Sequence, residues 1–576
     1  MIDTKKLEAF AAAARTQLLA EVEARLTIVL APASTARIEA PGAVKELEDA
    51  IVRHGGGREG RRHIVEEQAY VWFNQIIALR FMDVNRYTTT SVVSPEAGRA
   101  VGQPAVLAAA KRGEFDPEVF TQPAHMERIT GLLNDTLTSH DAQGEAYGLI
   151  LSAHCAFWHR AMPFMFTAER GPTGLLMPGN LLADDSVRAK AVETLTDEDC
   201  QDVEVIGWLY QFYISERKNE VFAGFKKNKK AGPDEITAAT QLFTPDWIVR
   251  YLVQNSVGRL WLLNHPESRI GEQMDYYIEP IDEEKDFLRI ERPEELTVMD
   301  PACGSGHMLT YAFDLLYAIY EEEGYAPFEI PGRILEHNLR GTEIDGRASE
   351  LAAFALMMKA RARRRSFLRE PVQPRIRVIE PVEFTPGELS RLVSTGGDRR
   401  AEEDFWQCFR HADTLGSLIR PDAETLTDAK TRAGKLDSDT LDDSDLGRRA
   451  EQVLNQAEYL AREYAVVVTN PPYMGSKNMG EALSGWVKTH HPKAKADLFA
   501  VFIERCMELS EDDHGLVAMI TMQAWMFLGS FEVLRRRILS SAPPVTMAHL
   551  GERAFDSIGG EVVSTTAFVL EGMRSP

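Results

Sequence analysis

The sequence predicts an α/β protein, in which a helical N-terminal region precedes a seven-stranded, mostly parallel sheet. Residues 1–225 carry apolar side chains at helical spacing, as in EEQAYVWFNQIIALRFMDV, and contain few strand-like runs. From residue 241 onward, short apolar runs alternate with helical segments, which is the pattern of a doubly wound sheet. A polar break that contains Gly and Pro, KNKKAGPDEITAAT, separates the two patterns. We therefore expect a helical domain at 1–225, a linker at 226–240 and an α/β domain at 241–576.

Short apolar runs mark the seven predicted strands. They are LTVMD (296–300), LRGTEI (339–344), IRVIE (376–380), AVVVT (465–469), GLVAMIT (515–521), VTMAHL (545–550) and VVSTTAFVL (562–570). A long polar stretch, at about 381–464, separates the third run from the fourth. We expect it to be a surface insertion, because it includes the acidic segment KLDSDTLDDSDLG.

Composition is that of a globular protein with more than one core, since the chain has 576 residues of which 44% are apolar. We find no apolar run long enough to span a bilayer, and the N-terminus scatters charges through its apolar positions, unlike a secretory signal. The five cysteines are scattered and never form a Cys-x-x-Cys pair, so the sequence predicts reduced thiols and no metal site. We therefore expect a cytoplasmic protein with no membrane contact.

The net charge of -23 argues against a surface that coats nucleic acid, because phosphate binding needs clustered Lys and Arg. Basic clusters do occur at FKKNKK (225–230), KARARRRSFLR (359–369) and LRRRIL (534–539). Each is equally well explained as a solvated helix face. Any contact with DNA must therefore be local.

A glycine-rich corner follows the first predicted strand, in VMDPACGSGHML. Asp300 ends the strand, Gly304 and Gly306 permit a tight turn, and a helix is predicted to begin near His307. Asp300 could meet a ligand's ammonium group, and no third glycine follows at the dinucleotide spacing. This favours an amino-acid-bearing nucleoside over NAD as the ligand. HGGGREGRRH (54–63), by contrast, lacks the Gly-Lys-Ser/Thr ending of a P-loop and is predicted to be a plain loop.

Two further motifs would complete such a ligand site. In GTEIDG, Glu343 is placed to accept both ribose hydroxyls and Ile344 to pack on a purine, although Asp345 could simply cap the next helix. In QLFTPDWIVRYLV, Thr244 is the expected N-cap and Pro245 the first helical residue. The same turn could close over the ligand's carboxylate.

The stretch VVVTNPPYMG places four special residues at the end of a buried strand. Pro471 and Pro472 remove two backbone donors, so the local carbonyls and the Asn470 amide oxygen form a group of acceptors beside the Tyr473 ring. Acceptors next to a stacking plane suit a planar group that carries an amino nitrogen. A rigid turn is the alternative for this string taken alone.

These four motifs, in this order, resemble the gamma class of amino-group DNA methyltransferases: FTPDW, DPACGSG, GTEID and NPPY. The sequence resembles still more closely the PglX family of phage-exclusion (BREX) systems, in the stretches QLFTPDWIVRYLVQNSVGRLW, NPPYMGSKNM and KADLFAVFIER. The resemblance implies a Rossmann-like sheet and a site-specific, adenine-specific DNA methyltransferase. It also implies S-adenosyl-L-methionine as cofactor, double-stranded DNA and other phage-defence proteins as partners, and an adenine flipped out of the helix.

The resemblance also assigns roles to residues. The methionine part of the cofactor would be lined by Asp300, Ala302, Gly304 and Gly306, and its carboxylate would be bound by Thr244 and Pro245. Its ribose and adenine would be held by Glu343 and Ile344, with a further adenine contact from Glu380. The target base would be held by Asn470, Pro471, Pro472 and Tyr473, with Phe555 stacked on its other face and Asp497 at the border of the pocket. At the position of Glu380 the family pattern usually has Asp. Methyl transfer to an amino group needs no covalent nucleophile, so Cys303 is expected only to pack.

One departure from the family concerns recognition, because in gamma-class enzymes a target-recognition domain follows the catalytic domain. This sequence stops at Pro576, just after the last predicted strand. We expect either that the chain is truncated or that a partner supplies recognition, and that residues 1–576 alone bind the cofactor and methylate DNA weakly or not at all. Two alternatives stay open: a cofactor-sensing assembly or regulatory subunit of a defence complex, and the methyltransferase part of a restriction-modification enzyme. Glutamine methyltransferases share NPPY but lack the helical leader and the Thr-Pro motif.

Overall fold

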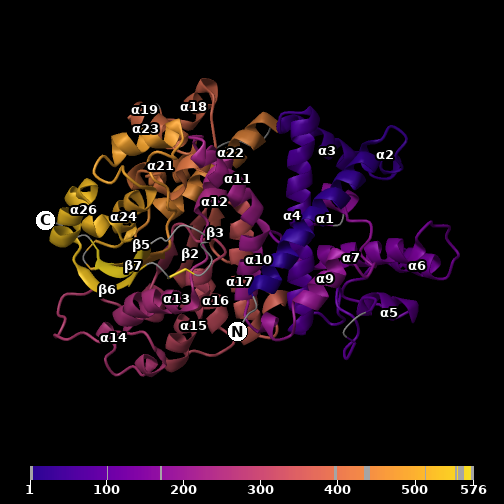
Figure 1. The fold of residues 1–576 in the computed structure, drawn as a ribbon, viewed down its shortest axis with the longest axis horizontal. Helices are drawn as coiled ribbons and strands as arrows, with labels where there is room; N and C mark the ends of the chain where they lie inside the picture. The colour runs from indigo at the N-terminus through magenta and orange to yellow at the C-terminus, as the bar shows by residue number, and fades with distance from the viewer. Residues whose placement is uncertain are drawn as a thin grey trace. The chain divides into compact units, whose positions relative to one another are not determined.

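The chain forms two compact units, Met1–Glu216 and Arg217–Pro576. Figure 1 shows the computed structural model. It describes residues 4–99, 102–168, 171–394, 398–433, 441–512, 514–551, 554–555 and 564–572. No helix in these ranges combines the length and the apolar character that crossing a membrane requires.

The first unit is helical, as predicted. Its helices are α1 (Thr4–Leu30), α2 (Ala36–Glu39), α3 (Pro41–Arg53), α4 (Gly57–Val84), α5 (Ala105–Lys111), α6 (Pro123–Leu133), α7 (Ala142–His159), α8 (Pro172–Leu175), α9 (Val187–Thr194) and α10 (Glu204–Tyr213); α11 (Ser215–Lys226) runs into the second unit. Helix α4 is buried along most of its length and packs against α1, α3 and α9. Its carboxyl-terminal Asp83 accepts hydrogen bonds from the backbone N–H groups of Val92, Val93 and Ser94, which fixes the following loop.

The predicted loop at 54–63 is wrong over most of its length. Gly55 and Gly56 have positive φ, as a chain reversal requires, but α4 already begins at Gly57. The polar residues Arg58, Glu59, Arg61 and Arg62 are good helix formers, and they continue the helix whose apolar face starts at Ile64.

The second unit contains the predicted seven-stranded sheet. Its strands are β1 (Val298–Asp300), β2 (Leu339–Glu343), β3 (Ile376–Val378), β4 (Val466–Thr469), β5 (Leu516–Met522), β6 (Pro544–Gly551) and β7 (Thr565–Glu571). Their order is β3-β2-β1-β4-β5-β7-β6, and only β7 runs antiparallel to its neighbours. Every predicted strand has its counterpart, so the fold-class prediction is confirmed.

Helices of the second unit pack on the sheet and on one another. They are α12 (Pro233–Thr240), α13 (Asp246–Val253), α14 (Arg259–Asn264), α15 (His307–Glu322), α16 (Ile330–Arg333), α17 (Gly346–Arg363), α18 (Pro386–Leu392), α19 (Arg399–Gln407), α20 (Ala412–Leu415), α21 (Ala423–Ala433), α22 (Leu441–Leu460), α23 (Glu481–His490), α24 (Leu498–Leu509), α25 (Ala524–Phe527) and α26 (Glu532–Ser541). All residues of β4 and nearly all of β5 are buried. Because successive strand side chains point to opposite faces, both faces of the sheet are covered.

We expected the polar insertion at about 381–464 to lie on the surface, but part of it is buried. It forms helices α18 to α22, and Phe405, Trp406 and Val453 are buried in the same core as strand residues. Helix α22 supplies Leu446, Ala450, Val453 and Ala457 at helical spacing, and it packs on β3. Part of the acidic segment, 434–440, lies outside the described residues.

The boundary between the units falls at Glu216, near the predicted domain end at 225. The predicted linker at 226–240 carries α12 in its second half, beginning at Pro233. The Glu235 carboxylate accepts a hydrogen bond from the Gly232 N–H and another from Lys229 Nζ, which stabilises the start of this helix. The predicted division into domains stays a prediction. About half of the predicted linker at 226–240 is helical.

Candidate active site

The candidate site lies where the strand order reverses, between β1 and β4. From β1 the chain first builds outward through β2 and β3, and it then returns to β4 on the other side of β1. In such sheets the carboxyl ends of the two central strands open into a crevice. Asp300 ends β1, Glu343 ends β2 and Asn470 directly follows β4. The sheet therefore gathers three of the predicted motifs at one edge.

Asp300 is buried and bonded to both neighbouring motifs. Its Oδ1 atom accepts hydrogen bonds from the Ala302 N–H (3.1 Å) and from the Thr469 hydroxyl (2.7 Å), and neither bond uses Oδ2. Burial raises the pKa of Asp300 to about 7, and the Glu343 carboxylate adds to the rise. A cationic ligand group at Oδ2 would favour the ionised form.

The glycine corner turns back over Glu343. Gly304 has φ +52° and its N–H donates to Glu343 Oε2 (2.9 Å), while Glu343 Oε1 accepts from the N–H groups of Ile344 and Asp345. Burial raises the pKa of Glu343 to about 7, against the effect of these three bonds. Gly306 has φ +88°, and a Cβ there would lie 2.9 Å from Ala352 Cβ in α17. The corner is thus built by backbone that other residues would strain or crowd.

Residues of the insertion reach the same corner. The Ser417 hydroxyl donates to the Pro301 carbonyl (2.6 Å) and lies 2.8 Å from the Thr342 hydroxyl. Gly416 has φ +50°, and a Cβ there would lie 2.7 Å from Ile344 Cγ2. The turn Gly416–Leu418 therefore fixes the ends of β1 and β2 and presses on Ile344.

The Asn470 side chain is oriented by its amide nitrogen. Nδ2 donates to Thr244 Oγ1 (3.1 Å) and to the Leu242 carbonyl (3.3 Å). Within the described chain no donor reaches Oδ1, although that oxygen is buried. An unsatisfied buried acceptor costs about 1–3 kcal/mol, so natural folds keep few of them. Directly after β4 the structure thus holds a hydrogen-bond acceptor that is ready for a donor from outside the described chain.

The Tyr473 ring is fixed beside Asn470. Its hydroxyl donates to the Ile520 carbonyl on β5 (2.9 Å), and its ring meets Phe499 edge-on with centroids 6.2 Å apart. Asp497 Oδ1 accepts from the N–H groups of Met474 and Phe499, so it braces the chain just after Tyr473. Burial raises the pKa of Asp497 to about 6, and it raises that of Tyr473 well above its usual value.

The motif at 241–253 differs in detail from its prediction. Helix α13 begins at Asp246, Pro245 precedes it in an extended conformation, and no side chain caps the helix. Thr244 is therefore not the N-cap, and its hydroxyl accepts from Asn470 instead. Phe243 also packs on His307 at the start of α15, with ring centroids 3.6 Å apart. The motif joins the glycine corner to the strand-end corner.

The other predicted residues are placed less tightly. Ile344 and Ala302 are partly buried at the corner, and Pro471 and Pro472 separate Asn470 from Tyr473. Glu380 is exposed, and its carboxylate accepts from Gln452 Nε2 of α22 (2.8 Å). Phe555 is buried, but the residues around it, 552–553 and 556–563, lie outside the described ranges. The cofactor and base contacts of these residues stay predictions.

Two alternatives from the sequence are decided by the geometry. Asp345 does cap α17, since its carboxylate accepts from the Arg347 N–H (2.9 Å). Cys303 is buried against Gly341, where an added Cβ would lie 3.1 Å from Cys303 Sγ. Burial raises the pKa of the Cys303 thiol well above its usual value. A thiol that stays neutral is a weak nucleophile, which agrees with the expectation that Cys303 only packs. All five cysteines are free.

Two contacts of the candidate site escaped sequence reasoning. Thr469 could have been found, because a polar residue that ends an apolar strand is buried and must find a partner. Ser417 gave no local signal, since its partner Pro301 is 116 residues away.

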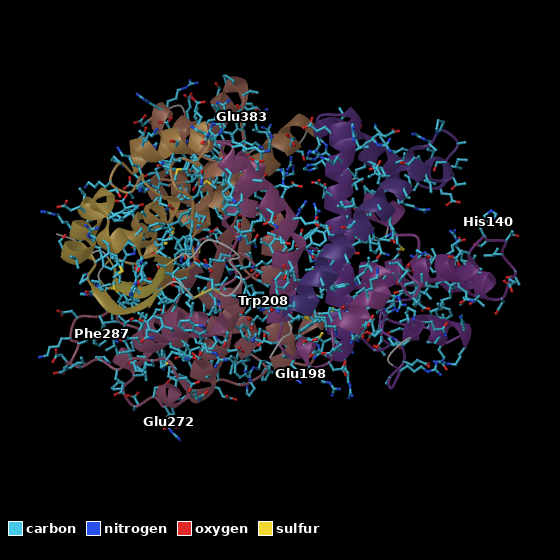
Figure 2. All side chains as sticks on the ribbon, viewed as in Figure 1. His140, Glu198, Trp208, Glu272, Phe287 and Glu383 are labelled. Atoms are coloured by element: carbon cyan, nitrogen blue, oxygen red, sulfur yellow. The ribbon has the colours of Figure 1, made fainter. Side chains whose placement is uncertain are left out.

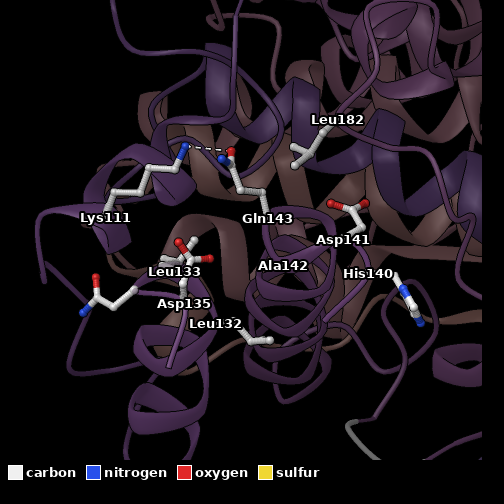
Figure 3. A pocket seen from close by; sticks show the side chains of 10 residues that line it. Lys111, Leu132, Leu133, Asp135, His140, Asp141, Ala142, Gln143 and Leu182 are labelled. Carbon is white, nitrogen blue, oxygen red and sulfur yellow. Dashed lines mark hydrogen bonds between the residues drawn. The ribbon is translucent and has the colours of Figure 1, made fainter. Parts of the chain in front are cut away.

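A pocket of about 540 Å³ in the first unit is a separate feature (Figure 3). Its lining includes Lys111, Asp135, His140 and Asp141, and Lys111 donates to Gln143 Oε1 (2.8 Å). None of the predicted site residues lines it.

Comparison with known proteins identifies relatives of the chain. Residues 337–555 match the family described as Eco57I restriction-modification methylase. The chain is 38% identical over 553 residues to the adenine-specific methyltransferase BrxX of Escherichia coli O9:H4 (strain HS), and the aligned region covers 90% of this chain and 45% of BrxX. It is 35% identical over 575 residues to the adenine-specific methyltransferase PglX of Lacticaseibacillus casei (strain Zhang), and the aligned region covers 94% of this chain and 45% of PglX.

These matches confirm the resemblance to PglX, and the chain spans less than half the length of either relative. The chain is thus a homologue of the adenine-specific methyltransferases BrxX and PglX, and it contains an Eco57I restriction-modification methylase domain.

Proposed function

We propose that this chain carries the catalytic site of a DNA methyltransferase that transfers a methyl group from S-adenosyl-L-methionine to N6 of a flipped adenine. The observation that carries the proposal is Asn470 Oδ1, a buried acceptor without a donor in the described chain. Turning the amide would break both bonds of the nitrogen and set Oδ1 against the Leu242 carbonyl oxygen, so the present orientation is favoured. An amino group that enters the corner supplies the missing donor.

The corner at β1 and β2 fits the proposed cofactor. Burial raises the pKa of Asp300 and of Glu343 to about 7, so a positive partner would favour their ionised forms, and Oδ2 of Asp300 makes no hydrogen bond in the described chain. Gly304 leaves the backbone open to close approach, because a Cβ there would meet no atom within 4 Å. S-adenosyl-L-methionine has an ammonium group for Asp300, ribose hydroxyls for Glu343, and a sulfonium that supplies the electrophilic methyl group.

Asn470 and Tyr473 would prepare the amino nitrogen. When Oδ1 accepts one N6–H, the nitrogen lone pair is drawn out of conjugation with the ring and becomes more nucleophilic. The Tyr473 ring, held by Ile520 and Phe499, provides a plane on which an extruded base can stack. An adenine in a duplex keeps N6 inside the stack, so it has to leave the helix to reach this corner.

Methyl transfer to duplex DNA tests the proposal. The protein, in excess over a long mixed-sequence duplex, is incubated with S-adenosyl-L-methionine labelled in the methyl group, and the digested nucleosides are separated. The duplex is of mixed sequence because the chain spans only 45% of each relative. Label in N6-methyl-2′-deoxyadenosine supports the proposal.

Three results would contradict it: label in N4-methylcytosine, label in protein glutamine, or no label in DNA. A duplex in which purine replaces adenine is the matched control, because purine keeps the ring and lacks the amino group. It should accept no label.

A further inference from the structure

Three segments far apart in the sequence meet at the loop that follows Asn470–Tyr473. The Ala231 N–H donates to the Asn478 carbonyl (2.9 Å), and the Ser476 N–H donates to the Ala496 carbonyl (3.0 Å). A Cβ at Gly480 would lie 2.7 Å from the Ala231 carbonyl oxygen, so a side chain there would push the segments apart. The segments 225–231, 475–480 and 491–497 therefore form one continuous surface beside the candidate base site.

This surface is rich in exposed lysines, which we call the lysine face. Its members are Lys226, Lys227, Lys230, Lys477, Lys493 and Lys495. None of the six forms an ion pair or a side-chain hydrogen bond with any described residue. Lys229, between them, is instead held by Glu235 at 2.6 Å. The only acidic residue in the three segments is Asp497, which is committed to backbone N–H groups.

In the other two basic clusters of the sequence, several side chains pair with carboxylates of this chain. In 359–369, Lys359 and Arg363 both pair with Asp314. In 534–539, Arg536 pairs with Glu532 and Arg537 with Glu504. Structure thus separates three clusters that looked alike in the sequence.

The lysine face gathers six unpaired lysines on a molecule whose net charge is -23. Acidic side chains such as Glu272 and Glu383 project from the second unit in Figure 2. Six unpaired cations gathered on one surface repel one another, and an anionic partner would relieve that repulsion.

We propose that the lysine face binds the phosphate backbone of double-stranded DNA beside the extruded adenine. The inference rests on the proposed function, which brings a duplex to the adjacent corner. Lysine ammonium groups act as mobile point charges, so they suit phosphates, which carry no sequence information, better than base edges. The face holds the duplex in place and does not select its sequence.

Binding of a short mixed-sequence duplex by the full chain tests the lysine face. Fluorescence anisotropy is followed over a range of NaCl concentrations for the wild type and for the variant Lys226→Gln, Lys227→Gln, Lys230→Gln. We expect the variant to lose on the order of 10- to 100-fold in affinity at low salt, and its salt slope to fall by about 3. A second variant, Lys477→Gln, Lys493→Gln, Lys495→Gln, should lose a similar amount, although these lysines lie on other segments.

The matched control is Lys5→Gln, Lys45→Gln, Lys285→Gln, which removes the same charge from exposed lysines elsewhere. An equal loss in control and test variants would overturn the inference, because it would reflect net charge alone. Tighter binding of single-stranded RNA of the same length would also overturn it.

Failure of the lysine face can be told apart from failure of the proposed function. If the wild type methylates adenine while the lysine variants bind duplex like the wild type, only the lysine face is wrong. If the lysine variants lose duplex affinity while the wild type never labels DNA, only the proposed methyl transfer is wrong.

Discussion

The two corners at the carboxyl edge of the sheet differ in how their polar groups are satisfied. At β1 and β2, Asp300 and Glu343 accept five hydrogen bonds from the chain itself. After β4, the Asn470 amide nitrogen has two acceptors and its buried oxygen has no donor in the described chain. The first corner is a cradle that stands without a ligand, and the second keeps one acceptor for a substrate. We expect binding to depend on the first corner and turnover on the second.

After substitution of Asn470, the largest loss of DNA methylation should come from removing the Tyr473 ring. Tyr473→Ala removes the ring on which the base would stack, and base–aromatic stacking contributes about 1–3 kcal/mol. We expect kcat/KM for DNA methylation to fall by on the order of 10- to 100-fold, with cofactor affinity little changed.

Tyr473→Phe is the matched control, because it keeps the ring and removes only the hydrogen bond to Ile520. Equal losses in the two variants would show that the hydroxyl matters and the plane does not.

Asp300→Asn should weaken the cradle. The substitution keeps an acceptor for Ala302 and Thr469 but removes the charge that would meet an ammonium group. A hydrogen bond to a charged group contributes about 1.5–3 kcal/mol, so the Kd for S-adenosyl-L-methionine should rise by roughly 10- to 100-fold in calorimetry. An unchanged Kd would separate Asp300 from the cofactor.

The pH dependence of cofactor affinity should follow the Asp300 carboxyl. Burial raises the pKa of Asp300 to about 7, so this group is largely ionised at pH 8 and largely protonated at pH 6. The cofactor's ammonium group would bind the ionised form, so affinity should fall as the pH drops through about 7, by roughly tenfold between pH 8 and pH 6. Asp300→Asn should flatten this dependence in the same calorimetric titration. A profile that is already flat in the wild type would argue against the charge pairing.

The smallest expected effect concerns Ser417, which positions the cradle through Pro301 and Thr342. Ser417→Ala removes one hydroxyl from two contacts, a change of about 0.5–1.5 kcal/mol. The KM for the cofactor should rise about threefold to tenfold while kcat stays close to the wild-type value. Ser390→Ala, at an exposed serine of the same insertion, should change neither constant. A loss of kcat at unchanged KM would place Ser417 with the second corner.

The sheet was predictable because its strands are short apolar runs with local sequence signals. VVVT and LVAMITM are buried on both faces, and nothing else in those stretches competes with a strand. The order of the motifs along the chain then placed Asp300, Glu343 and Asn470 at one edge.

Contacts between distant segments were not predictable. Thr244 looked like a helix cap because Thr-Pro is a typical helix start, but the extended Pro245 moves the start to Asp246 and frees the hydroxyl for Asn470. The insertion looked like surface because it is polar on average, yet a single turn at Gly416 and Ser417 reaches the cradle. Such pairings depend on tertiary packing, which composition does not record.

The role of Asn470 Oδ1 is the central claim, and the Asn470→Ala variant tests it most directly. Methylation of adenine in a duplex and binding of S-adenosyl-L-methionine are measured for this variant and for Asn180→Ala, an exposed control. We predict that Asn470→Ala lowers kcat by on the order of 100- to 1,000-fold while the cofactor Kd changes little, as expected when a group that orients the reacting atom is removed. Methylation that persists at the rate of the Asn180→Ala control would contradict the claim.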